Sequence, residues 1–109
     1  MRIGNVEIPS RLALAPMAGV TDAAFRQICA EMGAGLTCTE LISSKALCYH
    51  DKKTFTLLRQ FPGEHPGAVR IFGSDPVCMA EAAQIALEAT GADLIDINKI
   101  GRASCRERV

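Results

Sequence analysis

Apolar residues in this chain fall into short runs separated by longer stretches with helical spacing. The short runs predict four buried strands that end at proline, glycine or polar residues, over residues 12–15, 36–39, 68–72 and 92–98. A short β-hairpin is predicted ahead of them, over residues 1–9 with Gly4 and Asn5 at its turn.

The segment after the first strand predicts a helix. Thr21 or Asp22 is a suitable N-cap. The apolar residues beyond it share one face at helical spacing, and they are Phe25, Ile28, Cys29 and Met32. Gly33 is typical of the position just past a helix end, so we expect the helix to stop there.

A second clear helix start is Asp75, an N-cap residue followed by Pro76 at the first helical position. Gly91 closes this helix. Its expected buried face consists of Cys78, Ala82, Ile85 and Ala89. Between the second and third strands, residues 43–49 predict a short helix, and residues 50–66 predict a remnant of helix followed by a loop.

The predicted order is β-α-β-α-β-α-β, an α/β fold with parallel strands joined by right-handed crossovers. A doubly wound sheet and a (β/α)₈ barrel both begin in this way, and periodicity does not choose between them.

Charge is unevenly distributed along the chain, although 12 basic residues balance 12 acidic ones. Residues 99–109 hold four of the basic and one of the acidic residues, which leaves residues 1–98 with a net charge of −3. This body has no basic patch that would indicate nucleic-acid binding by charge alone.

No apolar run approaches the roughly 20 residues that span a bilayer, and the N-terminus lacks a signal-peptide core. We therefore expect a cytoplasmic protein with no membrane segment.

The five cysteines include no Cys-x-x-Cys pair. Cys48 and His50 are too isolated to indicate zinc binding, so no metal site is expected. The cysteines are interpreted as small buried thiols in a reducing compartment. His50 and His65 lie in polar segments and are expected to be solvated.

Every predicted strand ends in residues with distinctive chemistry. They are Pro16 to Gly19, Thr39 with Glu40, Arg70 with Gly73, and Asp96 with Asn98. In α/β proteins the carboxyl ends of parallel strands converge on one edge, where sites are built. The first strand end places backbone N–H groups beside a helix N-terminus, where a flat or anionic ligand can be held. A tight turn without a ligand is the equal alternative.

Glu40 and Arg70 have structural interpretations beside functional ones. Glu40 is expected to pair with Lys45 or to cap the following turn. Arg70, on a central strand, would be buried and would need an anionic or carbonyl partner. Glu40 on the neighbouring strand is the structural candidate for that partner, and a ligand is the functional one.

Five segments occur in an order typical of one family. They are Ala-Pro-Met-Ala-Gly-Val-Thr-Asp at 15–22, Glu-Met-Gly-Ala-Gly at 31–35, Thr-Glu-Leu-Ile-Ser-Ser-Lys-Ala at 39–46, Ile-Phe-Gly-Ser-Asp-Pro at 71–76 and Asp-Ile-Asn at 96–98. In these segments the chain resembles the bacterial tRNA-dihydrouridine synthases, most closely their B-type branch. The resemblance implies an FMN-binding (β/α)₈ barrel with a C-terminal helical domain that holds tRNA. It also implies that NADPH reduces the flavin, which in turn reduces a uridine of the tRNA to dihydrouridine.

The resemblance assigns cofactor contacts residue by residue. Pro16, Met17 and Ala18 correspond to the residues that hold the flavin at the end of the first strand. Arg70 stands where the family normally has a glutamine that contacts the flavin ring. A guanidinium only donates hydrogen bonds, whereas an amide also accepts them. Asn98 matches the asparagine that precedes the family's catalytic loop.

The resemblance ends after Asn98. The family continues with Met-Gly-Cys-Pro, whose cysteine is the proton donor, whereas this chain continues with Lys-Ile-Gly-Arg. Cys105 comes four positions too late to match that cysteine. Residues 99–109 instead resemble a translated sequencing adapter, and we interpret them as a non-native tail. Residues 1–98 are expected to form the N-terminal portion of the barrel, about four β/α units.

A chain without the catalytic cysteine is expected to be inactive by itself and at best a weak binder of FMN. Two other functions stay open at this point. One is a different FMN-barrel oxidoreductase, similar to the dihydroorotate dehydrogenases. The other is a stand-alone α/β module whose basic tail binds a partner or nucleic acid.

Overall fold

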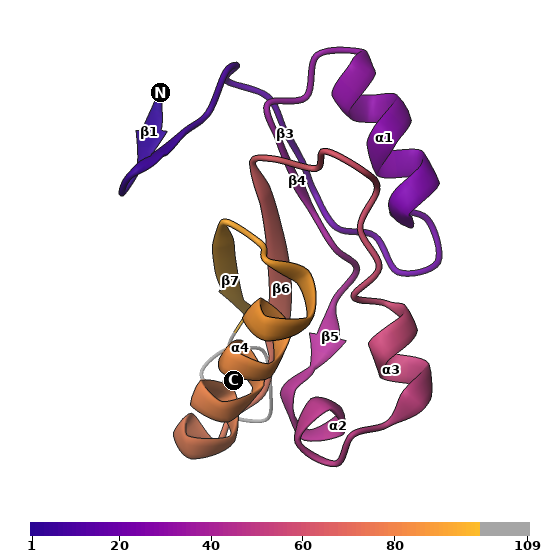
Figure 1. Ribbon diagram of the computed structural model, residues 1–109, viewed down its shortest axis with the longest axis vertical. Helices are drawn as coiled ribbons and strands as arrows, with labels where there is room; N and C mark the ends of the chain where they lie inside the picture. The colour runs from indigo at the N-terminus through magenta and orange to yellow at the C-terminus, as the bar shows by residue number, and fades with distance from the viewer. Residues whose placement is uncertain (99–109) are drawn as a thin grey trace, which may run out of the picture.

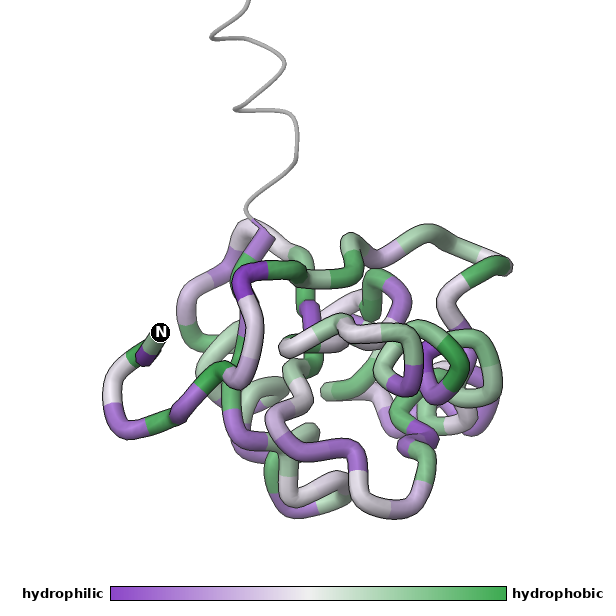
Figure 2. Tube along the Cα trace, turned by 90° about the horizontal axis from the view of Figure 1, so that it is seen from above, coloured by the Kyte–Doolittle hydropathy of each residue, from purple (hydrophilic) through white to green (hydrophobic). Residues whose placement is uncertain are grey.

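A computed structural model describes residues 1–98 of the chain. Its main sheet contains five parallel strands, namely β3 (Ala13–Leu14), β4 (Leu36–Cys38), β5 (Ile42–Ser43), β6 (Gly67–Phe72) and β7 (Leu94–Asn98) (Figure 1). An antiparallel hairpin of β1 (Arg2–Ile3) and β2 (Val6–Glu7) precedes the sheet. It lies to one side of the body in Figures 1 and 2. The predicted hairpin is therefore confirmed, whereas β5 is a short strand that the sequence pattern did not predict.

The strands of the main sheet lie side by side in chain order. β3 pairs with β4, β4 with β6 and β6 with β7, and β5 continues along the same edge of β6 beyond β4. A doubly wound sheet reverses its strand order at a switch point, whereas a barrel adds each strand beside the preceding one. The observed order is that of the first part of a (β/α)₈ barrel, and the predicted α/β fold is confirmed.

Four helices connect these strands, namely α1 (Ala23–Glu31), α2 (Ser44–Cys48), α3 (Lys52–Thr56) and α4 (Pro76–Thr90). The predicted capping is confirmed at both long helices. The Asp22 carboxylate accepts a hydrogen bond from the Phe25 N–H at 2.8 Å, and the Asp75 carboxylate accepts one from the Val77 N–H at 3.1 Å. Gly91 ends α4 with a φ of +69°, a conformation that favours glycine. Within residues 1–98, no helix is long and apolar enough to cross a membrane.

The hydrophobic core lies on one face of the sheet, between β6 and the helices α2 and α4. Its fully buried members are Ile42, Leu47, Val69, Ile71, Ala82 and Ala86. The predicted buried face of α4 is correct at Ala82 and wrong at Ala89, which is exposed. Ala86 is buried in its place because it lies one turn beyond Ala82 and faces the same strand. The two small side chains allow α4 to lie close to β6.

The opposite face of the sheet points away from the helices. Side chains alternate along a strand and paired residues share a face. The register therefore places Cys38, Ala68 and Leu94 in one row and Arg70 and Asp96 in another. The small residues Cys38 and Ala68 are buried, whereas the other three are half-buried. In a closed barrel this face lines the interior.

Helix α1 does not bury the apolar face that its spacing predicts. Ile28 is 53% exposed and Met32 is 82% exposed, while Arg26 between the apolar positions is only 1% exposed. The prediction was wrong at Ile28 and Met32, while Phe25 and Cys29 are half-buried. Helical spacing locates apolar residues but not a polar side chain that has a buried partner. α1 is attached to the body through Arg26.

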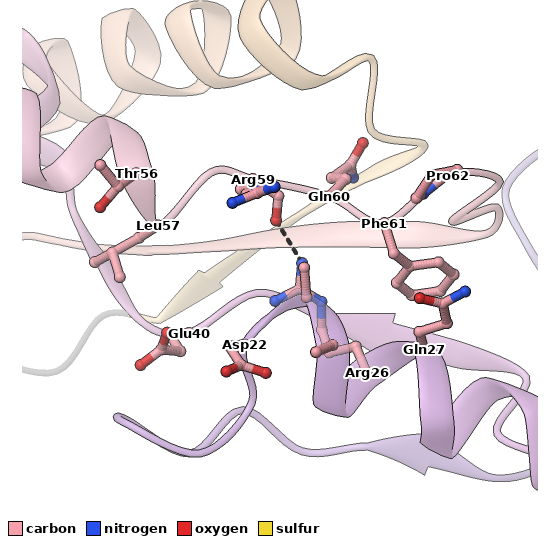
Figure 3. A pocket seen from close by; sticks show the side chains of 12 residues that line it. Asp22, Arg26, Gln27, Glu40, Thr56, Leu57, Arg59, Gln60, Phe61 and Pro62 are labelled. Carbon is pink, nitrogen blue, oxygen red and sulfur yellow. Dashed lines mark hydrogen bonds between the residues drawn. The ribbon is translucent and has the colours of Figure 1, made fainter.

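Arg26 belongs to a buried network that joins α1 to the loop before β6. Its Nε and Nη2 atoms donate to the Glu64 carboxylate at 2.8 and 3.2 Å. The guanidinium also donates to the carbonyls of Thr21 and Arg59, both at 2.7 Å. Figure 3 shows the Arg26 side chain reaching from α1 to the Arg59 carbonyl. Because buried Glu64 also accepts from the Thr37 hydroxyl at 2.6 Å, the network extends to β4.

Thr39 lies where the chain leaves β4 and before β5 begins, and it is fully buried. Its hydroxyl accepts a hydrogen bond from the Arg70 N–H at 3.2 Å and donates one to the Glu40 carbonyl at 3.0 Å. Its own N–H donates to the Ala68 carbonyl at 3.0 Å. The Thr39 side chain thus continues the connection between β4 and β6 beyond their regular pairing.

Candidate functional site

The carboxyl ends of β3, β4, β6 and β7 lie at one edge of the sheet because these strands are all parallel. Contacts link neighbouring strand ends. The Gly19 N–H donates to Glu40 Oε1 at 2.5 Å, which joins the loop after β3 to the chain after β4. Arg70 contacts both of its neighbours, through its N–H to Thr39 and through its side chain to Asp96. The predicted strand-end residues therefore form one row.

The loop after β3 is folded tightly around Thr21. The Met17 N–H donates to the Thr21 hydroxyl at 3.0 Å, and the Met17 carbonyl accepts from the N–H groups of Val20 and Thr21, both at 3.0 Å. Gly19 has a φ of +74°, and its N–H is directed to Glu40. The N–H groups of Met17, Gly19, Val20 and Thr21 all donate within the protein, so the backbone of this loop has the tight-turn form that was one of the two predicted alternatives.

The side chains of this loop, in contrast, are open to a ligand. Met17 is 44% exposed, Ala18 is exposed and Pro16 is half-buried. Pro16 has no N–H to donate, and the exposed surface of Met17 and Ala18 is apolar. A flat, largely apolar ring suits this surface better than an anion does.

The sequence predicted that Glu40 pairs with Lys45 or caps the following turn, whereas its carboxylate accepts the Gly19 N–H from the loop after β3. The structural reason is that the chain leaves β4 at Thr39, which brings Glu40 toward the loop after β3. Glu40 and Asp22 also line a pocket of about 530 Å³ between the start of α1 and residues 56–62 (Figure 3). Glu40 is thus a residue that positions the loop carrying Met17.

The partner of Arg70 is Asp96, not Glu40. The register of β6 and β7 places these two residues opposite each other, and Arg70 Nε lies 3.4 Å from Asp96 Oδ2. The side chains are 30% and 43% exposed. This contact is an ion pair but not a hydrogen bond, and Arg70 Nε is buried without an acceptor among residues 1–98. Because the side chain is 30% exposed, the donor capacity at the open face of the sheet belongs to the other N–H groups of the guanidinium and not to the buried Nε.

Asn98 is the last residue of β7 and lies in register with Phe72 of β6, half-buried. Asn98 and Met17 occupy opposite ends of the row of strand ends.

Cys38 lies beneath the row, on the same face as Arg70. Burial and the negative charge of Asp96 raise the pKa of the Cys38 thiol, and the positive charge of Arg70 opposes this shift only in part. The thiol of Cys38 therefore stays protonated near neutral pH.

Among residues 1–98, none of the described pockets is lined by the five candidate cofactor residues. The pocket of about 530 Å³ near α1 and a second one of about 640 Å³ between α2 and α4 are both lined by other residues. In the described part of the chain, no group of three histidine, cysteine or acidic side chains is arranged to hold a metal ion.

Comparison with known families decides the identity of the fold. The family model described as "Dihydrouridine synthase (Dus)" matches residues 13–101. The chain belongs to the dihydrouridine synthase family. The match spans all five candidate cofactor residues, namely Pro16, Met17, Ala18, Arg70 and Asn98, and the cofactor role of each stays a prediction.

Relatives within the dihydrouridine synthase family are about half identical to this chain. It is 50% identical over 100 residues to tRNA-dihydrouridine synthase B of Salmonella typhimurium and 49% identical over 100 residues to that of Escherichia coli K12. It is 45% identical over 98 residues to that of Pseudomonas aeruginosa. These alignments cover 90% of this chain but only 29–30% of each relative. The chain thus spans less than a third of the length of these family members.

Two contacts near this edge are not predicted by the sequence. The pairing of Asp96 with Arg70 depends on the register of β6 and β7. Of the two predicted helix caps, Asp22 caps α1, whereas Thr21 binds the Met17 backbone. The sequence signal for both roles is the pair Thr21 and Asp22, which follows Gly19 closely.

Proposed function

We propose that this chain is the N-terminal part of a cytoplasmic enzyme that reduces uridine in tRNA to dihydrouridine, with FMN as cofactor and NADPH as reductant. In this proposal residues 1–98 are barrel and residues 99–109 are a non-native tail. The family match over residues 13–101 carries the proposal. The row of strand ends supports it, because a barrel uses this edge for its active site.

The residues of the row fit a flavin ring. The exposed apolar side chains of Met17 and Ala18 would lie against the ring, and the tight loop would hold them in place. Arg70 would donate a hydrogen bond to a ring carbonyl from the accessible part of its guanidinium, because the side chain is 30% exposed at the open face of the sheet. Asn98 would supply an amide at the other end of the row. When bound, FMN supplies hydride transfer between NADPH and the uracil ring.

Arg70 in place of the family's glutamine changes the charge at this position. Its guanidinium favours a negatively charged ligand, and the carboxylate of Asp96 at 3.4 Å offsets part of that positive charge. The pair therefore keeps a donor at the ring while limiting the added charge. We infer that Arg70 still contacts the cofactor, as a donor only.

The test uses the protein encoded by the source DNA, read on past the codon for Asn98. We expect the reading frame to continue into Met-Gly-Cys-Pro, the purified protein to contain FMN, and its expression to restore dihydrouridine in tRNA from a strain that lacks it. A flavoprotein that leaves tRNA unchanged but reduces a small molecule would point to another FMN-barrel oxidoreductase. A stop codon after residue 109 would favour the stand-alone binding module.

The 109-residue chain by itself is expected to be inactive and to bind FMN more weakly than micromolar. Fluorescence titration of FMN with the purified chain measures this directly. Binding at micromolar concentration or below would show that the first strands of the barrel hold the cofactor without the others.

A further inference from the structure

Two thiols that are far apart in the sequence meet between α2 and α4. Cys48 is the last residue of α2, and Cys78 lies in the first turn of α4. Their Sγ atoms are 3.0 Å apart, and Cys48 Sγ also donates to the Cys78 carbonyl at 3.4 Å. Since the sulfur atoms of a disulfide are about 2.05 Å apart, they need to approach by only about 1 Å to bond.

The two thiols are accessible to small molecules. Both are half-buried, and both line the pocket of about 640 Å³ between α2 and α4. Hydrogen bonding to Cys78, together with burial and the charge of Glu81, raises the pKa of the Cys48 thiol to about 12. Cys48 therefore keeps its proton in the reduced pair, and the first attack is assigned to Cys78 in the first turn of α4.

We propose that Cys48 and Cys78 are a reversible oxidation site that reacts with low-molecular-weight disulfides such as oxidised glutathione. The Cys78 thiolate attacks one sulfur of the reagent, which forms a mixed disulfide and releases one thiol. Once Cys78 is in the mixed disulfide, its hydrogen bond with the Cys48 thiol, the main cause of the raised pKa, is lost. Cys48 then gives its proton to solvent, and its sulfur displaces the second thiol from Cys78. Two electrons pass from the cysteine pair to the reagent, and the Cys48–Cys78 bond replaces the reagent's own disulfide.

The new bond would restrain the edge of the sheet that carries the candidate site. Cys48 ends the helix that follows β5, and Cys78 begins the helix that follows β6. Oxidation therefore fixes α2 to α4 just beyond Arg70 and Phe72, through a covalent loop that contains α3 and β6. A reductant reverses the change.

The test treats the full chain with oxidised glutathione, blocks the remaining thiols by alkylation and maps the linkages after tryptic digestion. Cleavage at lysine and arginine places Cys48 in peptide 46–52 and Cys78 in peptide 71–99. We expect these two peptides to be joined, lighter by two hydrogens, and separated again by dithiothreitol. This linkage should be at least about tenfold more abundant than any other, because proximity gives the pair a high effective concentration.

Matched variants complete the test. Cys78→Ser should abolish the linkage, and Cys38→Ser, which removes a buried thiol elsewhere, should leave it intact. Oxidation should raise the Tm of the unsubstituted chain by about 5 °C or more and should not raise that of Cys78→Ser. Linkages of Cys48 to Cys29 or Cys38, or between chains, in similar amounts would overturn the proposal, as would full alkylation of both thiols.

Discussion

Two arginine–carboxylate pairs lie on opposite faces of the same sheet and differ in burial and bonding. Arg26 and Glu64 are each 1% exposed and share two hydrogen bonds. Arg70 and Asp96 are 30% and 43% exposed and meet in one contact of 3.4 Å. A buried, fully bonded pair fixes structure, whereas a half-open pair keeps a donor for a ligand. Burial, and not residue type, therefore separates the structural pair from the candidate functional one.

The largest expected effect comes from removing one partner of the buried pair. Glu64→Ala leaves the Arg26 guanidinium buried without its carboxylate, which should destabilise the fold by about 3–5 kcal/mol. Urea unfolding followed by circular dichroism measures the loss of stability. Disappearance of the cooperative unfolding transition would be the extreme form of this loss. Glu31→Ala, the same change at an exposed position of α1, should alter the free energy of unfolding by less than about 0.5 kcal/mol.

A double variant tests whether that loss reflects an uncompensated charge. Replacing both partners, Arg26→Met with Glu64→Leu, should recover most of the stability that Glu64→Ala removes. If the double variant were as unstable as Glu64→Ala, the hydrogen bonds to Thr21 and Arg59, and not the buried charge, would explain the loss.

Two adjacent residues of β6 compare the faces without involving charge. Ile71 is fully buried on the helix side, so Ile71→Ala should cost about 2–4 kcal/mol in the free energy of unfolding. Phe72 is half-buried on the open side, so Phe72→Ala should lower the free energy of unfolding by only about 1 kcal/mol. Urea titrations of both variants give the comparison. A larger loss for Phe72→Ala would mean that the open face is covered in solution.

A third pair, at the amino ends of β6 and β7, should have a smaller and pH-dependent effect. Burial opposes ionisation of Asp93, but hydrogen bonds from His65 and from the Gly67 N–H, each 2.9 Å long, outweigh it and lower the pKa of the carboxyl group. Asp93 therefore stabilises the fold above its unfolded pKa of about 4, and this contribution is lost as pH falls through the lower folded-state pKa.

The Asp93→Asn variant tests this pH dependence. It should lose less than about 1 kcal/mol at pH 7. As the pH is lowered below 4, the variant should lose stability less steeply than the unsubstituted chain does. Thermal melts across that pH range measure the difference as Tm. Parallel curves for the two proteins would contradict the assignment.

Replacing a member of the half-open pair should have the smallest effect on stability and, under the proposed function, a measurable effect on the flavin potential. In the full-length protein of that proposal, Arg70→Gln should change the free energy of unfolding by less than about 0.5 kcal/mol. It should also shift the flavin potential to more negative values by no more than about 20 mV, because a partly exposed charge contributes at most about 1 kcal/mol. Asp96→Asn is the matched variant and should shift the potential in the opposite direction. A spectroelectrochemical titration in which neither variant moves the potential would place Arg70 away from the ring.

Local signals in the sequence predicted most of the fold. Asp75, Pro76 and Gly91 bound α4 because capping and glycine conformation depend only on neighbouring residues. The parallel strands were predicted for the same kind of reason, since apolar runs and breaks are local. The strand order that distinguishes a barrel from a doubly wound sheet depends on long-range pairing, and only the structure supplied it.

The sequence predicted that the strand-end residues share one edge of the sheet, but it did not predict their contacts. Arg26 and Glu64 are 38 positions apart, and no local pattern connects them. The partner of Arg70 depends on the register between β6 and β7, which a sequence does not state. The sequence therefore predicted which residues lie at the carboxyl ends of the strands, but not which partners they contact across the sheet.

The buried hydroxyl of Thr39 has a consequence for sequence variation in this protein. The hydroxyl accepts from the Arg70 N–H and donates to the Glu40 carbonyl. The hydroxyl group, and not the outline of the side chain, is therefore what this position requires. Valine has nearly the same outline as threonine but would leave both backbone groups without a partner. In a saturation library screened for folded protein, serine should be enriched at position 39 and valine depleted, the reverse of what a hydrophobicity-based substitution matrix would rank for a buried site next to a strand.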